Sequence, residues 1–219
     1  EIIEPVNGQS LYSEKLLKVS GVRIPDSLTS LADASPSVLD IKRELVDHSE
    51  EAKIIYLPHT LNKYHIDWDM ALEGIAINNN TITFLVSNSG KPYLAGLLKD
   101  RWSRVAPTLL SKTIFVPSLD FVDYLNYIAQ SDLILDPFYR GCGTTAFDIF
   151  STGTPIVTMP GNRSRGRLVS GLYKYIGVTN PPIANDISEY IRMTTNLLSN
   201  KEKLILLKSE IKQKFDVFR

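Results

Sequence analysis

Short apolar segments alternate with segments of helical spacing along most of this chain. Runs rich in β-branched and aromatic residues, as buried strands are, occur at 53–58, 81–87, 112–117, 132–138 and 154–160. Apolar residues spaced for amphipathic helices follow these runs at 67–78, 91–106, 119–130, 144–153 and 167–177. This alternation predicts βαβ units and a parallel sheet with helices on both faces. The expected fold is therefore an α/β, doubly wound, Rossmann-like domain.

The two ends of the chain depart from this alternation. Near the C-terminus, a short extended PPIAN precedes two expected helices at 187–200 and 201–215. The first fifty residues carry Ser, Gly and Pro without a sustained period, and only 36–47 is predicted as a short helix. We therefore expect residues 1–50 to be a linker or interlobe segment and residues 51–219 to form the Rossmann-like domain. The start at EIIEPVNG, without Met, suggests a piece of a longer protein.

Composition and charge narrow the classes of partner. Lys and Arg number 24, as do Asp and Glu, so the net charge is zero and no broad nucleic-acid footprint is expected. No apolar run approaches the roughly 18 residues of a membrane span, so no membrane partner is expected either. Cys142 is the sole cysteine, which indicates a reducing, cytoplasmic compartment. The three histidines lack the spacing of metal ligands, and no metal site is expected.

A glycine-rich loop before the expected helix at 144–153 is the first candidate for chemistry. Ligands of doubly wound sheets bind beyond the carboxyl ends of the strands, where this loop lies. Gly141 and Gly143 allow the backbone to approach a ligand, and Thr144 and Thr145 offer hydroxyls beside unpaired helix N–H groups. This pattern predicts an anion site; equally, Thr144 only caps the helix and the glycines only form a turn. It matches neither a G-x-G-x-x-G motif nor a P-loop, which disfavours a simple dinucleotide enzyme or NTPase.

Other polar residues are expected at the same edge of the sheet. Asp148 lies one helical turn after Thr144, either to accept ribose hydroxyls or as a solvated acid favoured by the helix dipole. Lys63 follows the first strand, either to meet a diphosphate or as an exposed loop lysine. Tyr124 is better placed than Tyr127, one turn further on, to stack on a base.

The order of several motifs resembles one enzyme family. YLNYIAQSDLILDPF (124–138) and GTTAFDIFSTGTPIVTMPG (143–161) resemble the donor-binding half of the O-GlcNAc transferase family, which includes bacterial adhesin glucosyltransferases. LYSEKLLKVSG (11–21) and HTLNKYHIDWD (59–69) resemble further segments of these enzymes, in the same order. The resemblance implies a GT-B fold of two Rossmann-like lobes. This chain would be the C-terminal lobe, binding UDP-GlcNAc or UDP-glucose without a required metal or other cofactor.

The resemblance also implies a role for individual residues. Lys63 would be the catalytic residue, neutralising the diphosphate as it leaves. Thr144 and Thr145 would bind phosphate at the helix start, and Asp148, one turn later, would bind the ribose. Tyr124 would lie against the uracil, and Arg167 has no assigned role. The implied donor-binding residues are Tyr124, Gly143, Thr144, Thr145, Asp148 and Arg167. Gly143 departs from the histidine common in the family, and Asn62 from an aromatic residue before the lysine.

The function implied is inverting transfer of a hexose or GlcNAc from a UDP-sugar to protein side chains. A protein or peptide acceptor would bind through an N-terminal lobe outside this sequence, so the lobe alone should turn over poorly or not at all. One alternative is a UDP-sugar 2-epimerase-like enzyme, which shares the two-lobed architecture but normally has a different carboxylate and histidine set. Another is a non-catalytic module that binds a nucleotide sugar.

Overall fold

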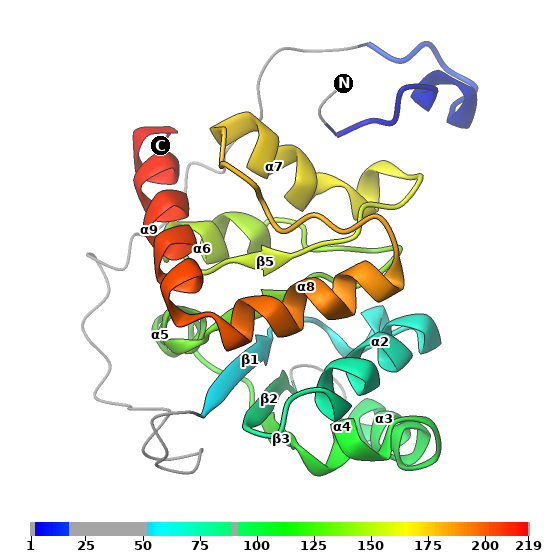
Figure 1. Ribbon diagram of the computed structural model, residues 1–219. Coiled ribbons are helices and arrows are strands. Elements are labelled where there is room, and N and C mark those ends of the chain that lie inside the picture. Colours follow the sequence, from blue (N-terminus) through cyan, green and yellow to red (C-terminus); the bar gives the residue numbers. More distant parts are fainter. Residues whose placement is uncertain (1–2, 18–51, 89–91, 219) are drawn as a thin grey trace.

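Five parallel strands form one sheet in the order β3-β2-β1-β4-β5 (Figure 1). The computed structural model describes residues 3–17, 52–88 and 92–218. The strands are β1 (Lys53–Leu57), β2 (Ile82–Ser87), β3 (Thr113–Val116), β4 (Leu133–Leu135) and β5 (Ile156–Val157). In register, Ile55 of the central strand lies opposite Phe84 on one side and Leu133 on the other. The predicted doubly wound α/β fold is confirmed.

Helices connect and cover the strands. They are α2 (Ile66–Ile77), α3 (Pro92–Val105), α4 (Pro107–Ser111), α5 (Phe121–Gln130), α6 (Thr145–Ser151), α7 (Leu168–Ile176), α8 (Ile187–Ser199) and α9 (Lys201–Phe218). Short 3₁₀ turns occur at η1 (Gly8–Leu11), η2 (Leu61–Lys63) and η3 (Ser164–Gly166). Right-handed crossovers place α2, α3 and α4 on one face of the sheet and α5 and α6 on the other. Helix α8 packs on α2, and α9 returns to contact α6 and α7 (Figure 1).

The core lies between the sheet and these helices. In β1 every residue after Lys53 is buried, as expected for the central strand of a parallel sheet. The indole of Trp68 in α2 is fully buried and donates to the Tyr190 hydroxyl of α8 at 3.2 Å. That hydroxyl in turn donates to the carbonyl oxygen of Asp136 at 3.0 Å. Polar contacts thus connect α2 and α8 to the end of β4.

Helix α4 was not expected from the sequence, which predicted one helix over 91–106. Pro107 begins this additional turn at the first helical position, where its missing N–H costs nothing. The Glu73 carboxylate of α2 accepts hydrogen bonds from the backbone N–H groups of Thr108 at 3.1 Å and Leu109 at 2.6 Å. A residue 35 positions earlier therefore caps this helix, and local sequence patterns do not contain that information.

All five strands are shorter than predicted, and β4 and β5 differ most. β4 and β5 end before the expected limits of 138 and 160, because the chain turns into the loops that follow. The extended PPIAN segment is confirmed in part, since Ile183 forms an isolated parallel bridge with Thr158. The helix predicted at 36–47 lies outside the described residues, and the division into 1–50 and 51–219 stays a prediction. In the described residues, no helix is both long and apolar enough to cross a lipid bilayer.

Candidate functional site

Two loops from distant parts of the sequence meet at the carboxyl edge of the sheet. Lys63 lies in η2, just after β1, and Gly141 lies in the loop that follows β4. The half-buried Lys63 donates a hydrogen bond from Nζ to the Gly141 carbonyl oxygen at 3.0 Å. The expectation that Lys63 and the glycine-rich loop share one edge of the sheet is therefore met in the fold.

A buried carboxylate holds the glycine-rich loop in place. Asp136, at the end of β4, is 2% exposed and accepts hydrogen bonds from Cys142 N at 2.6 Å and Thr158 Oγ1 at 2.7 Å. Burial raises the pKa of the Asp136 carboxyl group, and these hydrogen bonds oppose the rise. A Cβ atom on Gly141 would lie only 2.8 Å from Asp136 Oδ1, so this close approach requires glycine. Sequence reasoning missed Asp136, although an acid after the apolar LIL run is a visible signal.

The start of α6 exposes the residues that the sequence predicted to bind an anion. Gly143 and Thr144 are exposed, and Thr145, the first residue of the helix, is half-buried. Thr144 occupies the N-cap position, but its side chain makes no capping hydrogen bond. Thr144 is thus the N-cap residue without a side-chain cap, and the anion site at this helix start stays a prediction. A Cβ atom on Gly143 would meet no atom within 4 Å, which leaves open space above the loop.

Tyr124 and Asp148 form a second pair, from α5 and α6. The Tyr124 hydroxyl donates to Asp148 Oδ2 at 3.2 Å. Burial raises the pKa of the Asp148 carboxyl group, and the hydrogen bond from Tyr124 opposes the rise. Tyr124 also lines a cavity of about 300 Å³ beyond the ends of β1, β2 and β3. The other residues that line this cavity are Tyr56, Pro58, Ser87, Ser118, Leu119, Asp120 and Phe121.

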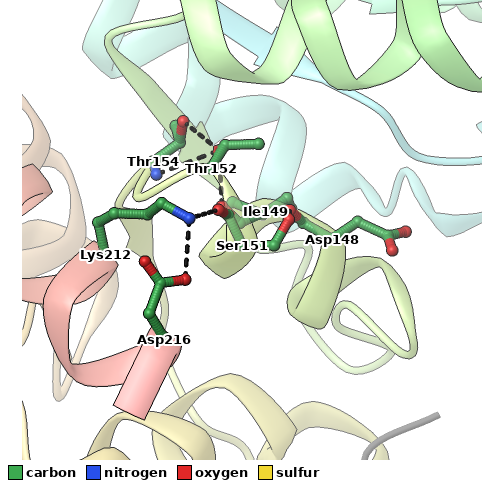
Figure 2. A network of polar contacts seen from close by, with 7 residues as sticks. All are labelled: Asp148, Ile149, Ser151, Thr152, Thr154, Lys212 and Asp216. Atoms are coloured by element: carbon green, nitrogen blue, oxygen red, sulfur yellow. Dashed lines mark hydrogen bonds and ion pairs between the residues drawn. The ribbon is translucent and has the colours of Figure 1, made fainter. Parts of the chain in front are cut away.

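Helix α9 fixes the far end of α6 (Figure 2). Lys212 donates from Nζ to the carbonyl oxygen of Ser151 at 2.8 Å and to Asp216 Oδ1 at 2.9 Å. The Ser151 hydroxyl donates to the carbonyl oxygen of Asp148 at 2.6 Å. A cation at a helix C-terminus also interacts favourably with the helix dipole. The short helix that carries Asp148 is thus anchored at the end opposite the candidate site.

Arg167 is engaged by backbone carbonyl groups. Its Nε donates to the Ile3 carbonyl oxygen at 2.8 Å and its Nη1 to the Gly161 carbonyl oxygen at 2.9 Å. These bonds connect the N-terminal segment to the loop after β5. The same loop adjoins the glycine-rich loop, because Gly141 N donates to Arg165 O at 3.1 Å. Arg167 therefore holds the loop after β5, and the backbone of Arg165 in that loop contacts the glycine-rich loop.

A buried histidine joins the ends of β1 and β4. His59 is 1% exposed, and its Nε2 lies 2.8 Å from the Leu135 carbonyl oxygen. Burial lowers the pKa of His59 to about 3, so the ring is neutral at pH 7 and Nε2 carries the donated hydrogen. In the sequence His59 stood out only as one of three histidines without the spacing of metal ligands. In the described residues, no group of three or more His, Cys, Asp or Glu side chains is placed to hold a metal ion.

Comparisons with known proteins assign this architecture to a class. The chain has the fold of a GT-B glycosyltransferase lobe. A mutant O-GlcNAc transferase from Thermobaculum terrenum superimposes with a TM-score of 0.81 at 16% identity, over 99% of this chain and 40% of that one. WaaG, a glycosyltransferase involved in lipopolysaccharide biosynthesis, superimposes with a TM-score of 0.61 at 13% identity, over 88% of this chain and 50% of that one. The E. coli trehalose-6-phosphate protein bound with UDP-2-fluoro glucose superimposes with a TM-score of 0.63 at 12% identity, over 86% of this chain and 46% of that one.

The sequence narrows the class further. Residues 122–217, a little under half of the chain, match the model of glycosyl transferase family 41. No curated protein sequence matches the chain. Together with the shared fold, the family match confirms the resemblance to the O-GlcNAc transferase family. The chain spans 40% of the length of the O-GlcNAc transferase that it matches.

Proposed function

We propose that this protein is the donor-binding lobe of a glycosyltransferase that takes its sugar from a UDP-sugar. The observation that carries the proposal is the contact of Lys63 with Gly141, which joins a cation to the glycine-rich loop at the ligand-binding edge of the sheet. The match of residues 122–217 to family 41 supports the same assignment. A UDP-sugar analogue bound to a structural neighbour supports the choice of donor.

Lys63 is the proposed catalytic residue because of where charge develops in the reaction. Breaking the bond between sugar and phosphate leaves negative charge on the departing UDP. A preorganised cation beside hydroxyl and N–H donors stabilises that charge in the transition state. Lys63 would supply the cation, and Gly143, Thr144 and Thr145 would contact the phosphates. No step in this scheme requires a metal ion.

The nucleoside would occupy the cavity beside α5. Asp148 would accept hydrogen bonds from the ribose hydroxyls, and its contact with Tyr124 would orient the carboxylate. The uracil would lie in the cavity lined by Tyr124. In this scheme Arg167 positions the surrounding loops, since its donors already contact Ile3 and Gly161.

The residues assigned so far would contact only the donor, and the acceptor requires a separate proposal. We infer inverting transfer of a hexose or GlcNAc to a protein side chain in the cytoplasm, with a second lobe binding the acceptor. The family match and the sole cysteine support this assignment. The isolated lobe should therefore bind the donor but catalyse transfer poorly.

Calorimetric titration of this chain with UDP, with GDP and ADP as controls, tests the proposal. UDP should bind selectively, and Lys63→Ala and Thr145→Ala should each weaken binding. Lys174→Ala, at an exposed position in α7, is the matched control and should bind UDP as the parent chain does. Absence of UDP-selective binding by the parent chain at millimolar concentrations would contradict the proposal.

A further inference from the structure

Tyr139 has a backbone conformation that is uncommon for a bulky residue. Its φ angle is +65°, in the left-handed region, and it lies in the loop between β4 and α6. Residues other than glycine rarely adopt this conformation because the Cβ atom clashes with the backbone, so a tyrosine there needs compensating contacts. Residues held in such conformations cluster at ligand-binding sites. The contacts that Tyr139 makes are therefore informative.

The Tyr139 side chain reaches to the beginning of α2. Its hydroxyl donates to Asp67 Oδ2 at 2.5 Å, and its ring lies edge-on to the His65 ring with centroids 4.8 Å apart. His65 is the N-cap residue of α2, and its Nδ1 accepts a hydrogen bond from Asp67 N at 3.2 Å. Tyr139 thus contacts both residues at this helix start, although the residue as a whole is 60% exposed.

The same two segments already meet at the candidate site. Asp67 follows Lys63 by four residues, and Tyr139 precedes Gly141 by two. The Tyr139–Asp67 and Lys63–Gly141 hydrogen bonds are therefore two adjacent connections between segment 63–67, which runs from η2 into α2, and the loop that holds Tyr139 and Gly141. Removing the outer connection frees these two segments to shift relative to each other, and with them the Lys63 ammonium group.

We propose that Tyr139 and Asp67 form a clasp, meaning this one hydrogen-bonded pair, that positions Lys63 for the diphosphate of the donor. The proposal rests on the function proposed above and adds two positioning residues to it. The clasp acts through Lys63 and does not itself contact the nucleotide. Its effect should consequently appear with ligands that carry a diphosphate and disappear with ligands that lack one.

Tyr139→Phe is the sharpest test, because it removes the hydroxyl and keeps the ring against His65. Calorimetric affinities for UDP and for uridine are measured with the parent chain and the variant. UDP binding should weaken by about three- to tenfold, the range expected for the loss of one ordinary, partly exposed hydrogen bond. Uridine binding should not change. Tyr93→Phe removes a hydroxyl from a tyrosine that is also 60% exposed, in α3, and should bind both ligands as the parent does.

Two further variants separate positioning from general loop stability. In a Lys63→Ala background, Tyr139→Phe should cause no additional loss of UDP affinity. Tyr139→Gly relieves the backbone conformation, so it should fold at least as stably as Tyr139→Phe while still binding UDP more weakly than the parent.

The outcomes distinguish this proposal from the one on which it rests. UDP-selective binding by the parent with unchanged affinity in Tyr139→Phe would refute the clasp and leave the proposed function intact. Equal losses for UDP and uridine, or an undiminished loss in the Lys63→Ala background, would also refute it. Failure of the parent to bind UDP would overturn both proposals.

Discussion

The buried histidine predicts a specific loss of stability in mild acid. Burial lowers the pKa of His59 from 6.5 to about 3, so between these values the unfolded chain binds a proton that the folded chain does not. Stability then rises with pH in this window and is lost as the pH falls below 6.5. From pH 7 to pH 5 the contribution of His59 to the free energy of unfolding should fall by about 2 kcal/mol, and by about 3 kcal/mol at pH 4.

Urea denaturation at pH 4, 5, 6 and 7, followed by far-UV circular dichroism, measures this dependence. Buried carboxyl groups such as Asp136, whose pKa is raised, act in the opposite direction, so the test is the difference between two chains. His59→Gln keeps an N–H donor near the Leu135 carbonyl oxygen and removes the titrating ring. The difference in unfolding free energy between parent and variant should therefore change by about 2 kcal/mol from pH 7 to pH 5.

A contrary result would be equally clear. Parallel stability curves for the parent and His59→Gln between pH 5 and pH 7 would refute the reasoning. Such curves would mean that His59 binds a proton as readily in the folded chain as in the unfolded chain.

Three further predictions concern stability, each measured by urea denaturation at pH 7. Gly141→Ala should cost about 1–3 kcal/mol, because its Cβ would crowd the fixed Asp136 carboxylate, whereas Gly143→Ala should be nearly neutral; equal effects would contradict this. Tyr173→Phe should cost about 2–4 kcal/mol, because the buried hydroxyl accepts from the Ile156 N–H at 2.8 Å and donates to the Ile156 carbonyl oxygen at 3.1 Å. A loss below about 0.5 kcal/mol would mean that these two backbone groups find other partners. Lys212→Met should cost about 1 kcal/mol by leaving the end of α6 without its cation, and an unchanged stability would contradict that role.

The fold was predictable because its signals are local. The strands β1 and β2 are short apolar runs, and each is followed by residues with helical spacing, so two βαβ units could be recognised without tertiary information. Helix α4 was missed because its cap is Glu73, from a different helix. The ends of β4 and β5 were placed too late because apolar residues continue past the last ladder pairs. Phe138, for example, is buried against Tyr190 outside any strand.

The candidate site was predictable only as far as it follows from the rule that ligands bind beyond the carboxyl ends of parallel strands. Parallel strands end at a common edge, so the meeting of Lys63 and the glycine-rich loop followed from their positions after β1 and β4. The support of that loop did not follow. Asp136 was treated only as part of an apolar strand, and His59 only as a histidine without metal-ligand spacing. Their roles depend on partners in the final three-dimensional arrangement, Thr158 and Leu135.

The site therefore divides into two kinds of polar residue with different physical requirements. Asp136 is buried and hydrogen-bonded within the protein, and a buried polar group without partners would cost stability. Thr144 is exposed and its side chain makes no capping bond, so its hydroxyl is available to a ligand at no such cost. Buried residues fix the backbone of the glycine-rich loop, and exposed residues on that backbone offer the donors. This division explains why sequence motifs indicated the exposed groups and not the buried ones: the exposed groups share a short segment, whereas the buried groups acquire their partners only when β1, β4 and β5 come together.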